Sequence, residues 1–324
     1  MLAAYAARLD PDDPLAGLNV GDIPEPEVPE GWTVVTVRAA ALNHHDLWSL
    51  RGVGLGAERL PMVLGCDAAG IDADGREVVV HAVIGDPAAG GGDETLDPAR
   101  TLLSELHPGT LAERVAVPRR NLIAKPAGLS FAEAACLPTA WLTAYRMLTT
   151  RGELPDGGTV LVQGASGGVA TAAMVLARAM GARVYATSRD AAKRERATGL
   201  GAVALATGAR LPERVDVVLE TVGEATFDHS MKCLKPGGRL VVSGATSGHQ
   251  VTMDLRRLFF LQTVLIGSTM GTRDELAALV ELCAEKALRP LIDSEYALAG
   301  ARDAFARLAG GQAFGKVVLT NGAG

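Results

Sequence analysis

The sequence has few aromatic residues, few cysteines and no long apolar run. Aromatic residues make up 4% of its 324 residues, and no two of its four cysteines form a Cys-x-x-Cys pair. Neither a disulfide framework nor a thiolate zinc cluster is therefore encoded, and isolated cysteines of this kind are expected to be buried apolar residues. No window approaches the roughly 18–20 uncharged apolar residues of a membrane span, and the first residues lack the pattern of a secretory signal, so a cytoplasmic protein is expected. The four cysteines are Cys66, Cys136, Cys233 and Cys283.

A basic surface is also missing. Lys and Arg number 31 against 37 Asp and Glu, which gives a formal net charge of -6. This balance argues against nucleic acid or an anionic membrane as the main partner, because phosphate binding needs a basic footprint. Glycine, by contrast, is abundant with 38 residues, and apolar residues make up 48% of the chain. Such a composition suits glycine-rich turns and close helix–sheet packing, and the length predicts two domains.

The predicted secondary structure changes near residue 126. Before it, short runs rich in β-branched residues predict strands at 33–39, 77–83 and 114–117. After it, predicted strands alternate with predicted helices, which is typical of βαβ units and a parallel sheet. The strands are expected at 159–163, 183–187, 215–219, 239–243 and from 264, with a last one at 316–320; the helices are expected at 169–180, 190–198, 273–287 and 301–309.

A glycine-rich turn lies between the first predicted strand of this second region and the helix that follows. Glycines let the backbone approach a pyrophosphate, and the exposed N–H groups at the start of the helix attract the anion. This context predicts a dinucleotide site, with a tight turn that binds no ligand as the alternative. The residues expected to bind the cofactor here are Gly164, Ala165, Ser166, Gly167, Gly168 and Val169.

The residue that follows the next strand favours NADP(H) over NAD(H). In NAD-binding units an acidic residue about 20 positions after the glycines takes the ribose 2′-hydroxyl, whereas this chain has Ser188, followed by Arg189 and Lys193. A hydroxyl with two cations suits a 2′-phosphate, which a carboxylate would repel. The alternative is a solvated helix face that carries charges of both signs.

The sequence resembles the medium-chain dehydrogenase/reductase superfamily, in particular its zinc-independent quinone oxidoreductase branch. The resemblance extends over nearly the whole chain and rests on the order of several short motifs. The resemblance implies an α/β fold with a GroES-like substrate domain from residues 1–123 and 288–324, a Rossmann domain from 124–287, and an active site in the cleft between them. It also implies a homodimer formed through edge strands near residues 264–270. The motifs are Ala41-Leu-Asn-His-His-Asp46, Leu64-Gly-Cys-Asp-Ala-Ala-Gly70, Gly109-Thr-Leu-Ala-Glu113, Leu137-Pro-Thr-Ala-Trp-Leu-Thr-Ala-Tyr145, Val218-Leu-Glu-Thr-Val-Gly223, Leu234-Lys-Pro-Gly-Gly238 and Gly315-Lys-Val-Val-Leu319.

Residues that follow the strands of the Rossmann domain are expected to form the cofactor wall, because ligands bind outside the carboxyl ends of parallel strands. Two threonines of the Leu137–Tyr145 motif are expected to line the nicotinamide pocket, with simple packing as the alternative. The strand-end positions are Glu220, Thr221, Gly223, Gly244, Ala245, Ser268 and Thr269, and the two threonines are Thr139 and Thr143.

The zinc-ligand positions of the superfamily's alcohol dehydrogenases carry Asn43, Cys66 and Thr139 here. A catalytic zinc needs about three protein ligands, so a single candidate thiolate is too few, and no bound metal is predicted. The structural-zinc lobe is replaced by a cysteine-free loop at 86–107. A metal site improvised from Cys66, Asp67 and His44 or His45 is the competing interpretation.

These features predict an NADPH-dependent oxidoreductase that transfers a hydride to a quinone, an enone or an enoyl thioester. The conjugated carbonyl of such a substrate itself accepts the developing negative charge. The protein therefore need only orient the substrate, exclude water and donate a hydrogen bond. By the resemblance, Asn43 orients cofactor or substrate, with capping of a helix at 46–50 as the alternative. Trp48 replaces the tyrosine of several relatives, which leaves solvent, His44 or His45 to protonate the product. The competing functions are a zinc-type alcohol dehydrogenase and a cofactor-binding protein with little turnover.

Overall fold

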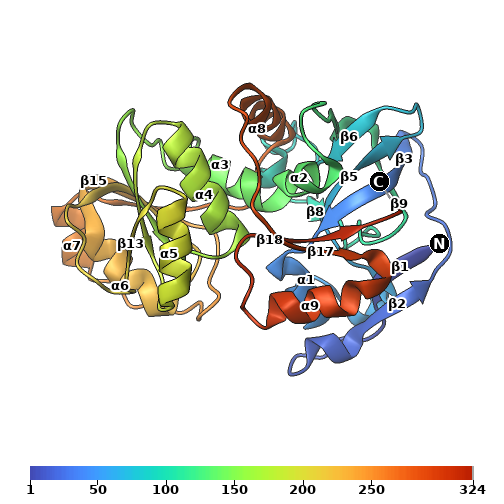
Figure 1. The fold of residues 1–324 in the computed structure, drawn as a ribbon, viewed down its shortest axis with the longest axis horizontal. Coiled ribbons are helices and arrows are strands. Elements are labelled where there is room, and N and C mark those ends of the chain that lie inside the picture. Colours follow the sequence, from blue (N-terminus) through green and yellow to red (C-terminus); the bar gives the residue numbers. More distant parts are fainter. Residues whose placement is uncertain (323–324) are drawn as a thin grey trace. The chain divides into compact units, whose positions relative to one another are not determined.

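The computed structural model describes residues 1–322, which fold into two compact units (Figure 1). The first unit comprises residues 1–142 together with residues 270–322, and the second comprises residues 143–269. The predicted α/β class, with a GroES-like sheet unit and a parallel-sheet unit, is confirmed.

The first unit is built mainly of strands. Its helices are α1 (His44–Leu50), α2 (Phe131–Ala135), α8 (Arg273–Glu285) and α9 (Ala301–Ala309). Its strands are β1 (Leu2–Ala6), β2 (Leu18–Asp22), β3 (Trp32–Ala41), β4 (Met62–Val63), β5 (Asp67–Asp72), β6 (Glu77–Val80), β7 (Val83–Ile84), β8 (Thr101–Leu102), β9 (Arg114–Pro118), β10 (Leu122–Ala124), β17 (Ile292–Ala297) and β18 (Lys316–Thr320).

The main sheet of this unit joins the two ends of the chain. Its strand order is β10-β6-β5-β3-β18-β17, with β9 also paired to β3. The last strand lies antiparallel to β3, with Val318 opposite Ala41 and Thr320 opposite Ala39, which confirms that the strand at 316–320 returns to the first unit. This pairing brings the start of β18 next to the residues that follow β3, where the candidate site begins.

The core of the first unit follows the periods of its elements. Alternate residues of β3 are buried, as expected for a strand with one face on the core. In α9 the buried residues recur at helical spacing, with Ala301, Ala304, Phe305 and Leu308 packed into the same apolar cluster as the strands.

The strand predicted at 77–83 is interrupted, and the prediction was wrong at this point. β6 ends at Val80 and β7 begins at Val83, because the side-chain amide of Asn121 donates hydrogen bonds to the carbonyls of His81 and Val83. These bonds take the place of a continuous strand ladder.

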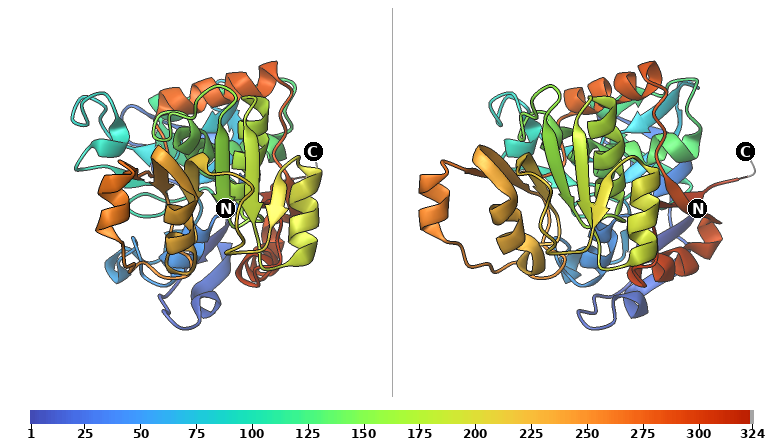
Figure 2. Two further views of the ribbon diagram at one scale, coloured as in Figure 1. Left: turned by 90° about the vertical axis from the view of Figure 1, so that its left-hand side faces the viewer. Right: turned by 60° about the vertical axis from the view of Figure 1, so that its left-hand side comes forward.

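The second unit is a doubly wound parallel sheet with the order β13-β12-β11-β14-β15-β16 (Figure 2). Because right-handed crossovers run outward in opposite directions from β11 and β14, helices cover both faces and the topological switch lies between these two strands. The strands are β11 (Thr159–Gln163), β12 (Arg183–Thr187), β13 (Val203–Leu205), β14 (Val215–Glu220), β15 (Leu234–Val242) and β16 (Val264–Gly267); the helices are α3 (Leu142–Leu148), α4 (Gly168–Ala179), α5 (Ala191–Gly199), α6 (Glu224–Cys233) and α7 (Leu255–Phe260).

The compact units do not follow the predicted domain boundaries at 123/124 and 287/288. Residues 124–142 and 270–287 belong to the first unit. The reason is packing: α2 lies against β3 and β5, and α8 lies against the π-helical turn Leu137–Trp141. Helical periodicity alone was a poor guide here, because α2 packs on the sheet of the strand-rich unit and α8 packs on a turn of the same unit.

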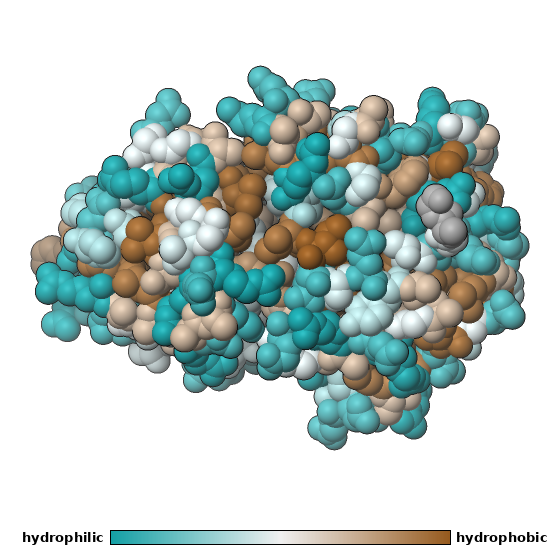
Figure 3. Space-filling view, in the orientation of Figure 1, coloured by the Kyte–Doolittle hydropathy of each residue, from teal (hydrophilic) through white to brown (hydrophobic). Residues whose placement is uncertain are grey.

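Hydrophilic side chains cover much of the face shown in Figure 3. Among residues 1–322, no helix combines the length and the apolar character that a bilayer crossing requires.

Candidate cofactor site and polar centre

The turn after β11 requires glycine for its backbone and leaves a helix end open. Gly164 has a φ of +79°, and an added Cβ would lie 3.2 Å from Cγ2 of Val222. Gly167 is the N-cap of the 12-residue helix α4 and makes no side-chain cap, and an added Cβ there would meet no atom within 4 Å. The first N–H groups of α4 therefore face open space at the positive end of a helix, which fits a pyrophosphate. Ala165, Ser166, Gly168 and Val169 lie in the same turn or the first turn of α4.

The segment after β12 contains an exposed cation, Arg189, that forms no ion pair within residues 1–322. Asp190 is the N-cap of α5 and accepts the N–H groups of Ala192 and Lys193, while Arg194 donates to the carbonyls of Ser188 and Arg189. Arg189 itself is exposed and makes no ion pair with another residue in 1–322. The predicted 2′-phosphate residues thus lie together, and the negative charge of Asp190 is held by the helix end.

The remaining predicted cofactor residues follow the ends of neighbouring strands. Thr221 and Gly223 follow β14, Gly244 and Ala245 follow β15, Ser268 and Thr269 follow β16, and Thr143 is buried in α3. An added Cβ at Gly223 would lie 2.4 Å from the carbonyl oxygen of Gly248. Packing between two loops of the protein therefore accounts for this glycine without any ligand.

Glu220, expected in the cofactor wall, is engaged by groups of the protein itself. It is fully buried, and its carboxylate accepts the N–H groups of Val222 and Gly223 and the hydroxyls of Thr226 and Ser230. With four donors engaged, it fixes the turn after β14 to the start of α6.

In the first unit, three side chains from distant segments form a closed buried cluster. The Lys316 ammonium donates to Oδ1 of Asn43 at 2.6 Å, to Oδ2 of Asp67 at 3.0 Å and to the carbonyl of Leu42 at 2.8 Å. The Asn43 amide in turn donates to Oδ2 of Asp67 at 2.9 Å and to the carbonyl of Ala41. The cluster fixes the Asn43 side chain and neutralises the buried ammonium with a buried carboxylate.

Asn43 is also the N-cap residue of α1, which begins two residues earlier than expected, at His44. The backbone N–H of Asn43 donates to Oδ2 of the fully buried Asp46 at 2.8 Å. Burial raises the pKa of Asp46 to about 6, so this carboxyl group carries a proton over a pH range in which exposed aspartates are ionised.

Next to this cluster, Cys66 contacts the loop at 86–107. Its thiol lies 3.3 Å from the carbonyl of Leu103 and 3.8 Å from the hydroxyl of Ser104, and that hydroxyl lies 3.2 Å from Nε2 of His45. Burial raises the pKa of Cys66 well above its usual range, so without a bound metal ion Cys66 is a neutral thiol near neutral pH. All four cysteines are free and buried, as predicted. We name Asn43, Asp46, Cys66, Asp67, Ser104, Lys316 and His45 the polar centre.

The donor set of the polar centre does not suit a catalytic zinc. Within residues 1–322, no three His, Cys, Asp or Glu side chains are arranged to hold a metal ion. Thr139, at the third zinc-ligand position, lies in the π-helical turn, and its buried hydroxyl has no hydrogen-bond partner in the described part of the chain. Trp48 is exposed on α1, with the Arg51 guanidinium 5.0 Å from its ring centroid.

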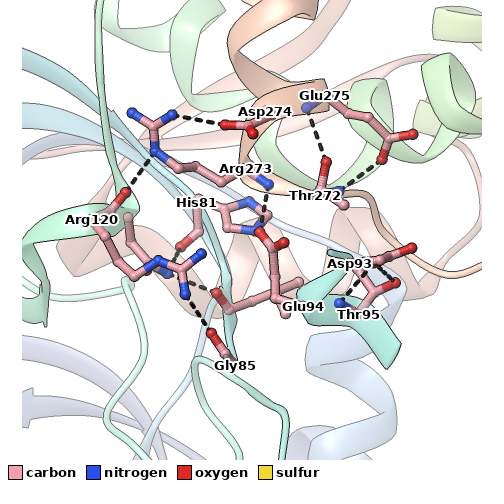
Figure 4. A network of polar contacts seen from close by, with 12 residues as sticks. His81, Gly85, Asp93, Glu94, Thr95, Arg120, Thr272, Arg273, Asp274 and Glu275 are labelled. Atoms are coloured by element: carbon pink, nitrogen blue, oxygen red, sulfur yellow. Dashed lines mark hydrogen bonds and ion pairs between the residues drawn. The ribbon is translucent and has the colours of Figure 1, made fainter. Parts of the chain in front are cut away.

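A second buried polar network anchors the loop at 86–107 (Figure 4). Nε2 of His81 lies 3.3 Å from Oε1 of Glu94, and the same oxygen accepts the backbone N–H of Arg273 at the start of α8. Burial lowers the pKa of His81; burial acts to raise the pKa of Glu94, but the contacts with His81 and the Arg273 N–H lower it to about 2. An ionised Glu94 therefore ties the loop both to the segment between β6 and β7 and to α8.

Sequence reasoning missed several of these residues, among them Lys316, Ser104 and Glu94. Lys316 was noted only as part of a motif, although a lysine in a strand predicted to return to the core is itself a signal of a buried partner. Ser104 and Glu94 lie in a loop without any periodic pattern, and nothing in the sequence distinguishes them from neighbouring polar residues.

Comparisons with known proteins identify the family of this chain. Residues 29–127 match the family model described as the alcohol dehydrogenase GroES-like domain, and residues 202–319 match the one described as zinc-binding dehydrogenase. An acryloyl-coenzyme A reductase from Metallosphaera sedula is 31% identical over 94% of this chain and 96% of its own length. The chain belongs to the medium-chain dehydrogenase/reductase superfamily.

Solved structures of this superfamily share the whole fold. A structure described as an NAD-dependent alcohol dehydrogenase has a TM-score of 0.91, with 32% identity over 99% of this chain and 100% of its own. A 2-octenoyl-CoA carboxylase reductase in complex with NADP and 2-octenoyl-CoA also has a TM-score of 0.91, with 25% identity over 98% of this chain and 87% of its own. The superfamily therefore includes both alcohol and enoyl-thioester chemistry on this fold.

Proposed function

We propose that this protein is an NADPH-dependent reductase of enoyl thioesters. The observation that carries the proposal concerns the three zinc-ligand positions. Two of them hold Asn43, in the polar centre, and Thr139, in the π-helical turn, and these residues do not supply a zinc site. A conjugated thioester can react there because its own carbonyl accepts the developing charge. The similarity to an acryloyl-coenzyme A reductase and to a structure that binds 2-octenoyl-CoA supports the thioester over a quinone.

The choice of NADPH is supported by the segment after β12. Ser188 stands where NAD-binding units have a carboxylate, and Arg189 is exposed and unpaired within residues 1–322. The NADP in the 2-octenoyl-CoA carboxylase reductase complex agrees with this choice. When bound, NADPH supplies the hydride; the open end of α4 would hold its pyrophosphate, and Ser188 and Arg189 would hold its 2′-phosphate.

The chain's own contribution at the polar centre is orientation. Lys316 and Asp67 fix the Asn43 amide, and Asn43 and Asp46 together fix the start of α1. The buried thiol of Cys66 is held as a neutral group. A site organised in this way keeps its polar groups fixed and needs no rearrangement during hydride transfer.

The cofactor assignment is tested by replacing Arg189 and Lys193 together with Ala. Loss of charge-assisted bonds to a phosphate, each worth about 1.5–3 kcal/mol, should raise the KM for NADPH roughly tenfold or more and leave the KM for NADH nearly unchanged. Lys232→Ala, which removes an exposed cation of α6 paired to Asp228, is the matched control. Equal effects of the double change on both cofactors would contradict the 2′-phosphate assignment.

We also propose a homodimer in which β16 meets its copy. β16 is the edge strand of the parallel sheet, and its Val264 and Leu265 are 40% and 44% exposed. Phe259 and Phe260 at the end of α7 are also exposed. An unpaired edge with apolar side chains is a surface that proteins normally cover.

A further inference from the structure

The two ring nitrogens of His45 differ in their surroundings. Nε2 lies 3.2 Å from the hydroxyl of Ser104 and 3.4 Å from the hydroxyl of Ser49, one turn along α1. Both serines are fully buried, while His45 is partly exposed. The Nε2 edge of the ring is therefore turned toward the protein interior, and Nδ1 has no hydrogen-bond partner among residues 1–322.

Ser104 is held in a conformation that is costly for serine. Its φ is +73°, in the left-handed region, and such a backbone costs a non-glycine residue about 1–3 kcal/mol. Glycine would avoid this cost but would remove the hydroxyl. That hydroxyl contacts both Nε2 of His45 and, at 3.8 Å, the thiol of Cys66. Strain at a buried hydroxyl with two such contacts points to a function for the hydroxyl.

These contacts place His45 at the polar centre. Cys66 occupies a metal-ligand position of the superfamily's alcohol dehydrogenases, and His45 follows Asn43, the N-cap of α1, by two residues. We propose that His45 is the acid that protonates the reduced substrate, with Ser104 and Ser49 as the residues that position its ring. This role rests on the proposed function, because it requires a reaction that consumes a proton at carbon.

The step balances as follows. The β-carbon of the enoyl thioester receives the hydride, and the electron pair of the double bond moves toward the thioester carbonyl. The α-carbon then takes the Nδ1 proton of the His45 imidazolium, so that a C–H bond forms as the N–H bond breaks. Nε2 keeps its proton, which it donates to the Ser104 or Ser49 oxygen, and the neutral ring is reprotonated by water.

The test is chemical rescue of His45→Ala by imidazole. Removing a general acid lowers kcat about 10²–10⁴-fold, and imidazole added to the buffer should restore part of that loss in the variant without accelerating the unaltered enzyme. His45→Gln fills similar space and can still bond Ser104, so it should fold and lose kcat to a similar extent, without rescue. Ser104→Gly should lower kcat several-fold while leaving the urea midpoint unchanged or higher, because glycine accepts the φ of +73°.

Two results would overturn the role of His45. One is a kcat within about threefold of the unaltered enzyme in both His45 variants; the other is imidazole rescue in His44→Ala instead of His45→Ala. The unaltered protein is assayed first with NADPH and crotonyl-CoA, acryloyl-CoA and 2-octenoyl-CoA. Absence of turnover with all three would contradict the proposed function and this role with it, whereas turnover that is independent of His45 would contradict this role alone.

Discussion

The buried pair of Lys316 and Asp67 should dominate the stability of the first unit. Lys316 is 3% exposed and Asp67 is fully buried, with 3.0 Å between Nζ and Oδ2. Lys316→Met leaves a buried carboxylate without its cation, and Asp67→Asn leaves a buried ammonium without its anion. Each single change should therefore lower the free energy of unfolding by about 3–5 kcal/mol.

The double change should lower the free energy of unfolding by less than the sum of the two single changes. Neutral side chains of similar volume often replace a buried ion pair with little loss, so Asp67→Asn with Lys316→Met should cost about 1–2 kcal/mol. The resulting coupling energy would be at least about 4 kcal/mol, well outside the additivity expected of independent sites.

The assay can be confined to the relevant unit. All three tryptophans, Trp32, Trp48 and Trp141, lie in the first unit, so their fluorescence during urea unfolding follows that unit alone. With a slope of about 3 kcal/mol per molar urea, each single change should lower the midpoint by roughly 1 M or more. Single changes that each cost under about 1 kcal/mol, or effects that simply add, would refute the description of the pair as a mutually dependent buried unit.

Three further predictions follow from the same structure. Asp46→Asn should raise the free energy of unfolding at pH 7 by up to about 3 kcal/mol. The pKa of Asp46 is raised from 3.8 to about 6, so ionisation of this group destabilises the folded protein as pH rises through that range. The urea midpoints of the two proteins should converge near pH 4, and a variant that is less stable at pH 7 would contradict the sign. Gly167→Ala should weaken NADPH binding, measured by calorimetry, with a stability change within about 1 kcal/mol, whereas Gly164→Ala should also destabilise the protein because of its φ of +79°; normal NADPH affinity in Gly167→Ala would place the pyrophosphate elsewhere. Leu265→Lys should convert the proposed dimer to a monomer, as measured by analytical ultracentrifugation. If the unaltered protein is itself a monomer, the proposed dimer is contradicted.

Much of the second unit could be predicted from the sequence because its signals are local. The strands at 159–163 and 183–187 are buried β-branched runs, and they match β11 and β12 at both ends. The helix that follows Gly164 begins within one residue of its predicted start, since a glycine turn fixes where a strand can end and a helix begin. The helix α6 was not predicted, because its polar and apolar residues give only a weak helical pattern.

The first unit was less predictable because its structure depends on contacts between distant segments. Lys316 and Asp67 meet only because β18 returns to pair with β3. The assignment of Asn43 as a site residue came from family resemblance, while the cation that fixes its side chain could be found only once the sheet had formed. The loop that supplies Ser104 and Glu94 is held by tertiary hydrogen bonds, which leave no period in the sequence.

The central claim is that this chain reduces an enoyl thioester with NADPH. The most direct measurement incubates the purified protein with crotonyl-CoA and NADPH deuterated at the transferable position, and analyses the thioester product by mass spectrometry. We predict saturated butyryl-CoA that carries deuterium at the β-carbon, formed in equal amount to the NADPH consumed and at a rate unaffected by a metal chelator. An unchanged thioester, or NADPH oxidation supported only by quinones or by a metal-dependent carbonyl reaction, would contradict the account.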